Sequence, residues 1–417
     1  MADDDSTDPH TSGRTSGGDH GDPTDGPVRI TRPDGLVAAI PYLLGHRPTR
    51  SLVAVGLHGR EVRLAARVDL AVGGPPGTPA PGWPHLAGVL VRNRCTAVLV
   101  AVYADDDAEE VARRDAGALD ALAETVRSGL RSVAGAPDLL DLVHVGPTRY
   151  RSLLCDDAAC CPPGGRDTDG LASHPVAAAF VVGGRTFAAD RSAVEPEPDP
   201  ASPVDLATAA AAHRRAVRAQ RSRPGGAGPD PVGRAELLEE WLGHLPAPPP
   251  PESTGRLVGA WRVDRGLRDA CLTALTPAGP GGARDLLAGR DTHHVLDRAA
   301  HLGTTGLDAA GVVLRRMASL SAPLGRAVVL AGHAWLAWTA GDGTRALVLA
   351  ERALRDDPRQ SLAALVLQCL DHGLGPHPVT DHETDPAVPP GVEPGRASVP
   401  SAGEARQAGC GLDGSAA

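Results

Sequence analysis

The sequence contains no lysine and no long apolar run, and only 2% of its residues are aromatic. All 41 basic residues are therefore arginine, and 51 acidic residues outnumber them, which gives a formal net charge of −10. A net acidic chain lacks the basic face that a protein coating nucleic acid needs. No stretch approaches the roughly 18 apolar residues of a membrane span, and the acidic N-terminus lacks the basic start of a signal peptide. We therefore expect a cytoplasmic protein that does not enter a membrane.

The scarcity of aromatic residues also limits how a core can be built. The chain has 50 glycine and 39 proline residues, so we expect cores of alanine, valine and leucine. At 417 residues the chain exceeds one ordinary core, and typical domain sizes predict two domains with disordered ends. Seven cysteines scattered over this length do not make a disulfide framework. In a reducing compartment they remain thiols or metal ligands.

Composition divides the chain into five segments. Polar, acidic or proline-rich stretches cannot offset the entropy of ordering, so they predict disorder at both ends and a linker between the two domains. The predicted segments are a disordered acidic N-terminus at 1–27, an α/β domain at 28–194, a Pro-rich linker at 195–203, a helical domain at 204–374 with loops at 224–232 and 246–254, and a disordered tail at 375–417.

The first of these domains alternates between strand and helix patterns. The predicted elements are a helix from Asp34 to Gly45, strands at Ser51–Leu57 and Glu61–Leu70 that meet at His58-Gly59, a helix near His85–Asn93, a strand at Ala97–Tyr103, a helix from Asp107 to Val133, a strand at Leu142–Val145, and a strand pair at Val176–Val182 and Thr186–Ala189. Ser51–Leu57 is apolar on both faces, as in a central strand, whereas Glu61–Leu70 alternates and has one wet face. This order predicts a mixed sheet with helices against it.

Beyond the linker, every periodic segment is helical, which predicts an all-α domain. The predicted helices are Val204–Arg221, Arg234–Leu245, Gly255–Leu275, Ala283–Ala288, His293–Leu302, Asp308–Leu320, Leu324–Ala340, Thr344–Arg355 and Ser361–His372. Near the end, Gly341-Asp342, the small residues Ala346 and Ala350, and Asp357-Pro358 resemble the second half of a tetratricopeptide repeat. Only one such unit is visible, so we expect a tetratricopeptide-like helical hairpin that packs on its own domain.

Three cysteines close together form the most chemically suggestive cluster. Cys155, Cys160 and Cys161 are followed by Pro162-Pro163, and thiolates in a proline-stiffened loop can bind zinc or iron. Structural zinc sites usually combine two spaced pairs of ligands, and a second pair is missing here. A fourth ligand would have to come from His144, Asp156, Asp157 or His174. The alternative is a set of partly buried thiols in a tight loop.

A second candidate site lies where the first helix leads into the first strand. Arg47, in the loop His46-Arg47-Pro48, could bind an anion, and with Ser51 it could line a pocket. The alternative for Arg47 is a surface ion pair with a carboxylate. Ser51 lacks the glycine elbow of a serine nucleophile, and no histidine and aspartate are placed by a recognisable signature. We therefore assign no catalytic residue.

A third candidate is the basic end of the first helix of the helical domain. Its arginines could contact nucleic acid, although a solvated helix face is the commoner outcome for such a charge run. They are Arg214, Arg215, Arg218, Arg221 and Arg223.

Several separated stretches also carry a family resemblance. They are Leu43-Leu44-Gly45 with Pro48 and Ser51-Leu52-Val53, Arg67-Val68-Asp69-Leu70, Cys155 with Cys160-Cys161-Pro162, Leu267-Arg268-Asp269-Ala270, and Trp335 through Gly341-Asp342 to Asp357-Pro358 and Ser361-Leu362-Ala363. Together they resemble the mostly actinobacterial family known as domain of unknown function 4192, over roughly Ile30 to Pro376. The resemblance implies no activity. It directs attention to the cysteine loop and the helix-to-strand junction as shared features.

These observations leave three hypotheses. The first is a non-enzymatic cytoplasmic binding or scaffold protein that recruits another protein through its helical domain, because no complete catalytic constellation is present. The second is a metal-dependent enzyme or sensor that uses the loop of Cys155, Cys160 and Cys161; its cofactor stays open, and zinc is one candidate. The third is nucleic-acid binding through the helix carrying Arg214–Arg223, which the net acidic charge disfavours. The oligomeric state stays open.

Overall fold

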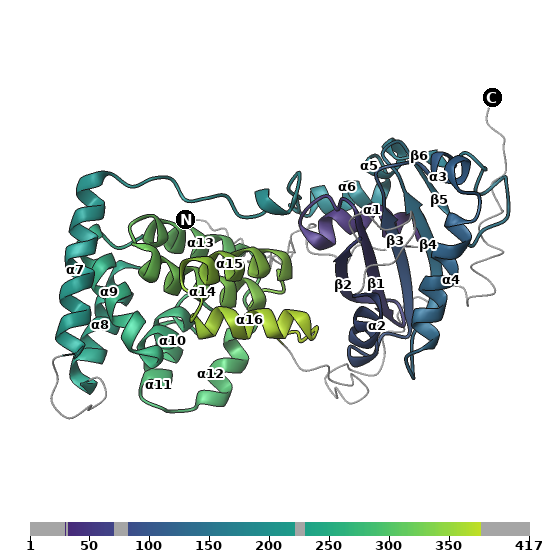
Figure 1. Cartoon of the computed structure of the whole chain (residues 1–417). Helices are drawn as coiled ribbons and strands as arrows, with labels where there is room; N and C mark the ends of the chain where they lie inside the picture. Colours follow the sequence, from purple (N-terminus) through teal and green to yellow (C-terminus); the bar gives the residue numbers. More distant parts are fainter. Residues whose placement is uncertain (1–29, 31, 71–81, 222–229, 377–417) are drawn as a thin grey trace, which may run out of the picture.

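The computed structural model describes residue 30 and residues 32–70, 82–221 and 230–376 (Figure 1). These residues form a six-stranded mixed sheet covered by helices, followed by a larger array of helices. The predicted combination of an α/β part and a helical part is therefore confirmed. The disordered ends predicted at 1–27 and 375–417 and the loop predicted at 224–232 lie wholly or mostly outside the described residues. None of the described helices is long and apolar enough to cross a membrane.

The six strands of the described sheet run in the order β2-β1-β3-β4-β5-β6. They are β1 (Ser51–His58), β2 (Glu61–Asp69), β3 (Ala97–Tyr103), β4 (Asp138–Val145), β5 (Arg149–Ser152) and β6 (Arg166–Asp167). β3 and β4 are parallel, and the other neighbouring pairs are antiparallel. A parallel pair needs a long crossover connection, and the chain between β3 and β4 supplies it with two helices.

β1 and β2 form the predicted hairpin. Their register pairs Ser51 with Asp69 and His58 with Glu61. Gly59 in the turn has a φ of 57°, a conformation that favours glycine because a Cβ is strained there. All residues of β1 except the last are buried, as predicted for a central strand. β2 is the edge strand and stays partly exposed along its length.

Helices cover both faces of the sheet (Figure 1). In this part of the chain they are α1 (Pro33–Leu44), α2 (Trp83–Arg92), α3 (Ala108–Arg114), α4 (Ala118–Arg131), α5 (Asp169–Ala172) and α6 (Pro175–Val182), with the 3-10 turn η1 (Arg191–Ala193). α2 and α4 pack on the face that holds Leu52 and Val100, whereas α1 packs on the face that holds Val53 and Leu99. Successive residues of a strand point to opposite faces, so the apolar strands β1 and β3 contribute side chains to a core on each face of the sheet.

The strand pair predicted at Val176–Val182 and Thr186–Ala189 is wrong. The first segment belongs to helix α6, and the second makes one isolated β-bridge. Pro175 has a backbone angle suited to the first turn of a helix, and His174 Nδ1 accepts a hydrogen bond from the Val176 N–H at 3.1 Å. An unbroken apolar run has no period, so the sequence pattern cannot separate a buried helix from a buried strand.

The single helix predicted from Asp107 to Val133 is also wrong, because the chain forms α3 and α4 instead. Between them Asp115 takes an extended conformation, and its Oδ1 accepts a hydrogen bond from the Gly117 N–H at 2.9 Å. A short carboxylate that bonds the backbone in this way competes with the helical hydrogen bonds.

The second half of the chain is an array of helices (Figure 1). They are α7 (Pro203–Arg221), α8 (Pro231–His244), α9 (Pro251–Val263), α10 (Arg265–Thr273), α11 (Gly279–Leu287), α12 (Thr292–Ala299), α13 (Thr304–Ser319), α14 (Pro323–Thr339), α15 (Gly343–Asp356) and α16 (Ser361–Asp371). The predicted helix Gly255–Leu275 is divided into α9 and α10. At the junction, the Asp264 carboxylate accepts a hydrogen bond from the Leu267 N–H at 3.0 Å and caps α10.

Two glycines of α9 lie directly against the backbone of α7. A Cβ placed on Gly255 would stand 2.0 Å from the Ala209 carbonyl oxygen, and one on Gly259 would stand 2.9 Å from the His213 carbonyl oxygen. Residues four apart share one face of a helix, so the two glycines together make room for α7. A chain with few large side chains thus gains contact area by bringing helix backbones together.

The segment predicted as a linker lies against the helical array, where it runs in an extended form between η1 and α7 (Figure 1). Glu195 is only 2% exposed, and its carboxylate lies 3.3 Å from Arg315 Nη1, 3.7 Å from Arg345 Nε and 3.9 Å from His333 Nδ1. Burial raises the pKa of Glu195, and the two arginines oppose that shift. These contacts fix the start of the linker to α13, α14 and α15.

The end of the helical array returns to the α/β part. Carbonyl oxygens of residues 371–373, at the end of α16, accept hydrogen bonds from His85 Nε2, Arg92 Nε and Asn93 Nδ2 at 2.6, 3.2 and 3.0 Å. The last carbonyls of a helix have no partner within the helix and attract positive or donor groups. The end of α16 is therefore held by donors from α2 and the residue after it.

Candidate metal centre

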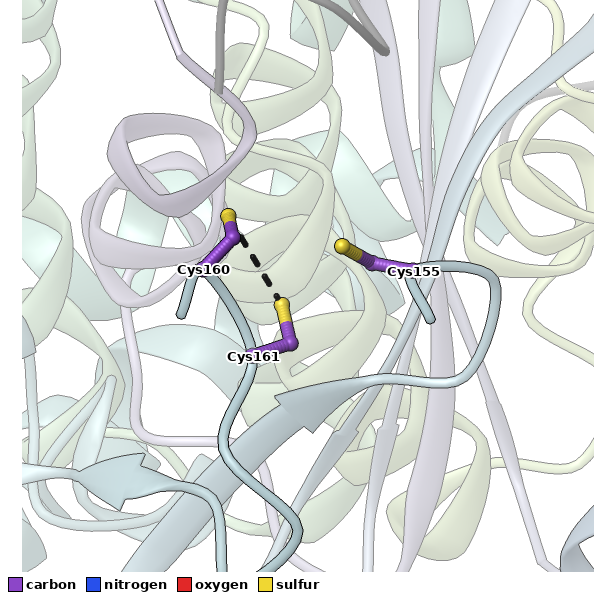
Figure 2. Close-up of side chains that lie close together, drawn as sticks. All are labelled: Cys155, Cys160 and Cys161. Atoms are coloured by element: carbon purple, nitrogen blue, oxygen red, sulfur yellow. Dashed lines mark hydrogen bonds between the residues drawn. The ribbon is translucent and has the colours of Figure 1, made fainter. Parts of the chain in front are cut away.

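The structure brings Cys155, Cys160 and Cys161 together in the loop between β5 and β6. Their Sγ atoms all lie within 4.8 Å of one another, and those of Cys160 and Cys161 are 4.0 Å apart. Figure 2 shows the three thiols directed toward a common space. Sulfur ligands on a tetrahedral zinc ion at 2.3 Å would be about 3.8 Å apart. The cluster therefore needs to contract by about 1 Å or less to hold such an ion.

Three arginines hold this loop in shape through its carbonyl oxygens. Arg166 Nε donates to the Cys160 carbonyl at 2.8 Å, Arg151 Nη1 to the carbonyl of residue 163 at 3.0 Å, and Arg149 Nη1 to the carbonyl of residue 165 at 3.2 Å. The bonds join the loop to β5 and β6, so its backbone is fixed at three points.

Ser152, the last residue of β5, connects the thiols to the sheet. Its Oγ donates a hydrogen bond to Asp141 Oδ1 at 2.5 Å and accepts one from the Cys155 N–H at 3.1 Å. A backbone hydrogen bond from Ser152 opposes the rise in the pKa of Cys161 that burial causes. Groups that bond the ligands of a metal orient them for binding. Ser152 therefore holds the loop backbone at Cys155 to the sheet.

The thiolate form of Cys161 is electrostatically unfavourable without a cation. Burial raises the pKa of Cys161 to about 12, and the neighbouring sulfurs of Cys155 and Cys160 raise it as well. All three cysteines are partly exposed, so the cluster is open to solvent on one side. A divalent cation would offset the repulsion among three thiolates.

The four predicted candidates for a fourth ligand do not join the cluster. Within the described residues, the group of metal-ligating atoms contains the three cysteines alone. His174 uses Nδ1 to cap α6, and its Nε2 lies 3.9 Å from Asp34. Asp157 Oδ1 accepts a hydrogen bond from the backbone N–H of residue 159. Asp156 is exposed, and His144 is buried on β4.

Acid is expected to destabilise the fold through His144. Its side chain is 2% exposed, its Nδ1 has no hydrogen-bond partner among the described residues, and burial lowers its pKa to about 4. A histidine in the unfolded chain has a pKa of about 6.5, so between these two values the unfolded state binds the extra proton. Stability therefore falls as the pH falls through this window.

This effect should lower the free energy of unfolding by about 2 kcal/mol between pH 7 and pH 5, as measured by urea denaturation. The His144→Leu variant, which cannot titrate there, should lose that part of the pH dependence. Equal pH dependence in the variant and the parent chain would contradict the assignment.

The second candidate site lies elsewhere on the sheet. Ser51 begins β1, whereas the cysteine loop follows β5, and strands β3 and β4 lie between them. Ser51 is fully buried, and its Oγ has no hydrogen-bond partner among the described residues. Arg47 is exposed, and its backbone N–H donates to the Ala188 carbonyl at 3.0 Å. Arg47 and Ser51 therefore do not share a pocket with the thiols.

The third candidate, the basic end of α7, lies only partly within the described residues. Arg215 forms an ion pair with Glu252 at 3.0 Å, and the side chain of Arg214 is exposed. Arg223 lies outside the described residues. Nucleic-acid binding through this helix stays a prediction.

The sequence patterns did not reveal the groups that support the thiols. Ser152 and Asp141 lie on two strands, and no spacing rule connects them. The arginines of β5 alternate with Tyr150 and Ser152, which is a signal for a strand with two different faces. That signal locates the strand, but it does not say which carbonyl oxygens the arginines reach.

The described residues define a protein of two parts, in which a mixed α/β sheet carries a cluster of three thiols and a helical array holds the linker and contacts α2. The chain belongs to the family described as Domain of unknown function (DUF4192), whose model matches residues 33–377. This match extends over both parts and confirms the resemblance carried by the sequence. No curated protein and no solved structure matches the chain. Because the family has no assigned function, function is argued from the site.

Proposed function

We propose that the protein binds one thiophilic metal ion, with zinc as the first candidate, through Cys155, Cys160 and Cys161. The observation that carries this proposal is the convergence of three Sγ atoms within 4.8 Å of one another in a loop fixed by arginines. Soft thiolate ligands select zinc, copper(I) or iron over magnesium and calcium. Three thiolates resemble the ligand count of zinc sites that keep one position open.

The site suits a metal-dependent sensor or enzyme of the kind that the sequence leaves open. The loop is partly exposed, so an ion in it can be reached from solvent. The chain contributes the three cysteine sulfurs, the hydrogen bond that holds the Cys155 backbone, and the arginine that holds the Cys160 carbonyl. A soft metal there supplies Lewis acidity and a place for a further ligand.

Elemental analysis of the full chain, purified without chelator, tests this proposal. We expect about one zinc, copper or iron ion per chain, since three converging cysteine sulfurs bind such ions tightly once metal binding has displaced their protons. Apoprotein should also take up one cobalt(II) ion and develop sulfur-to-cobalt charge-transfer absorption. A chain that is free of metal as isolated and that takes up neither zinc nor cobalt would refute the proposal.

We also infer a scaffold role for the helical part, in which α14 and α15 form a tetratricopeptide-like hairpin. Gly341 has a φ of 77°, and Asp342 Oδ1 accepts a hydrogen bond from the Arg345 N–H at 2.9 Å, which together support a tight turn between the helices. The small residues Ala346 and Ala350 are fully buried, as close helix packing requires. The last helix, α16, leaves Leu365 54% exposed for a protein partner.

Affinity capture from the protein's own cells, with quantitative comparison of variants, tests the scaffold role. Leu365→Glu should lose a partner that the parent chain retains, because a carboxylate cannot be buried in an apolar contact. Val232→Glu, at a position on α8 that is 64% exposed, is the matched control and should retain it. Equal capture by all three chains would contradict a partner site on α16.

A further inference from the structure

The three-thiol site leaves one coordination position for a ligand that the described chain does not supply. A soft divalent ion such as zinc prefers four ligands in a tetrahedron. Among the described residues, only the sulfurs of Cys155, Cys160 and Cys161 belong to the group. All three cysteines are partly exposed, so solvent molecules can reach the fourth position. We propose that this position takes the thiolate of a small molecule, an inference that rests on the proposed metal binding.

The chemistry of the donor set favours sulfur over oxygen at this position. Three thiolates donate strongly to the ion and reduce its net charge, so it acidifies a bound water less than an ion held by neutral imidazoles does. Soft ligands also prefer one another on the same ion, and the four-sulfur site is a common stable arrangement for zinc. Water in the fourth position is therefore the weaker ligand, and a thiolate replaces it.

The surrounding charges accommodate the extra negative charge. A zinc ion with four thiolates carries a net charge of −2. Arg149, Arg151 and Arg166 each bond the loop, whereas the acidic side chains of the loop are those of Asp156 and Asp157. These three guanidinium groups and the two loop carboxylates together add a net charge of +1. This charge offsets half of the −2 charge of a zinc ion with four thiolates.

The binding step is a ligand exchange without electron transfer. A thiol loses its proton to solvent water, a metal–sulfur bond forms, and the bond between the metal and its water breaks. One proton is released for each thiol bound at a pH below the pKa of the free thiol. The step needs no oxidant or reductant. A metal-bound thiolate stays nucleophilic, so the substrate class of such a site is a low-molecular-weight thiol.

Cobalt(II) in place of zinc makes the exchange visible in the full chain. Cobalt-loaded protein is titrated with 2-mercaptoethanol, and separately with its oxygen analogue ethylene glycol. We expect the sulfur-to-cobalt absorption to rise by about one third as three sulfur ligands become four. The rise should saturate at one thiol per cobalt, release one proton, and be absent with ethylene glycol.

The outcomes separate the inference from the metal proposal. Failure of cobalt to bind overturns both. Cobalt binding with a three-sulfur spectrum that 2-mercaptoethanol does not change overturns the inference and leaves the metal proposal in place. A four-sulfur spectrum before any thiol is added also overturns it. In that case Cys410→Ser, at a cysteine outside the described residues, shows whether the chain itself supplies the fourth sulfur.

Discussion

Replacing Cys160 or Cys161 by serine is expected to remove the bound metal almost completely. Each substitution leaves two thiolates and a hydroxyl that does not ionise at neutral pH. Because affinity for a soft ion depends on the number of thiolates, metal content should fall from about one ion to below about 0.1 per chain. Elemental analysis of each variant, purified beside the parent chain, measures this change.

Cys369→Ser is the matched control for these variants. Cys369 lies on α16, is partly exposed like the three loop cysteines, and is not part of their group. Its replacement should leave the metal content unchanged. Retention of a full equivalent of metal by Cys160→Ser, or its loss in Cys369→Ser, would contradict the assignment. Far-UV circular dichroism of each variant confirms that the fold is kept.

Replacing Gly255 by alanine is expected to destabilise the helical part strongly. The new Cβ would stand 2.0 Å from the Ala209 carbonyl oxygen and 2.7 Å from its carbonyl carbon, and backbone atoms cannot rotate aside as a side chain does. α7 must therefore move away from α9. Overpacking of this kind costs about 3 kcal/mol, even after the gain in helix propensity from glycine to alanine. Thermal or urea unfolding of the variant measures the loss.

Gly243→Ala tests the same chemical change without the close contact. Gly243 lies within α8, and a Cβ placed there meets nothing within 4 Å. The substitution should stabilise the protein by up to about 1 kcal/mol through helix propensity and a less flexible unfolded chain. If the two variants had equal stability, contact between α7 and α9 at Gly255 would not be important for the fold.

Local patterns predicted most of the elements correctly. The strand Ala97–Tyr103 and the hairpin of β1 and β2 were predicted from apolar runs and a glycine turn, because those signals depend on a few adjacent residues. The predictions were wrong where a single side chain determines the local conformation of the backbone. Asp115 and Asp264 end helices within continuous apolar spacing, and the cap at His174 starts a helix in an apolar run that resembles a strand.

The candidate site was predicted in part. The cluster of Cys155, Cys160 and Cys161 is visible in the sequence because all three residues fall within one short loop. A fourth protein ligand was sought among nearby residues, and none of the four candidates joins the group. Residues that are close in the sequence can direct their side chains to different places. After the loop the chain continues into β6, which makes hydrogen bonds of its own.

The sequence alone determined the division into an α/β part and a helical part, because the spacing of apolar residues that distinguishes strands from helices is visible in neighbouring residues. It also determined that alanine, valine and leucine would make up most of the core, to which the structure adds the buried side chains of Trp83, Trp241 and Trp261. The tertiary structure alone decided that Asp141 and Ser152 support the thiols, that Glu195 ties the linker to the helical array, and that Gly255 lies against α7. Each of these contacts joins residues that are apart in sequence, and only the packing of whole elements sets such distances.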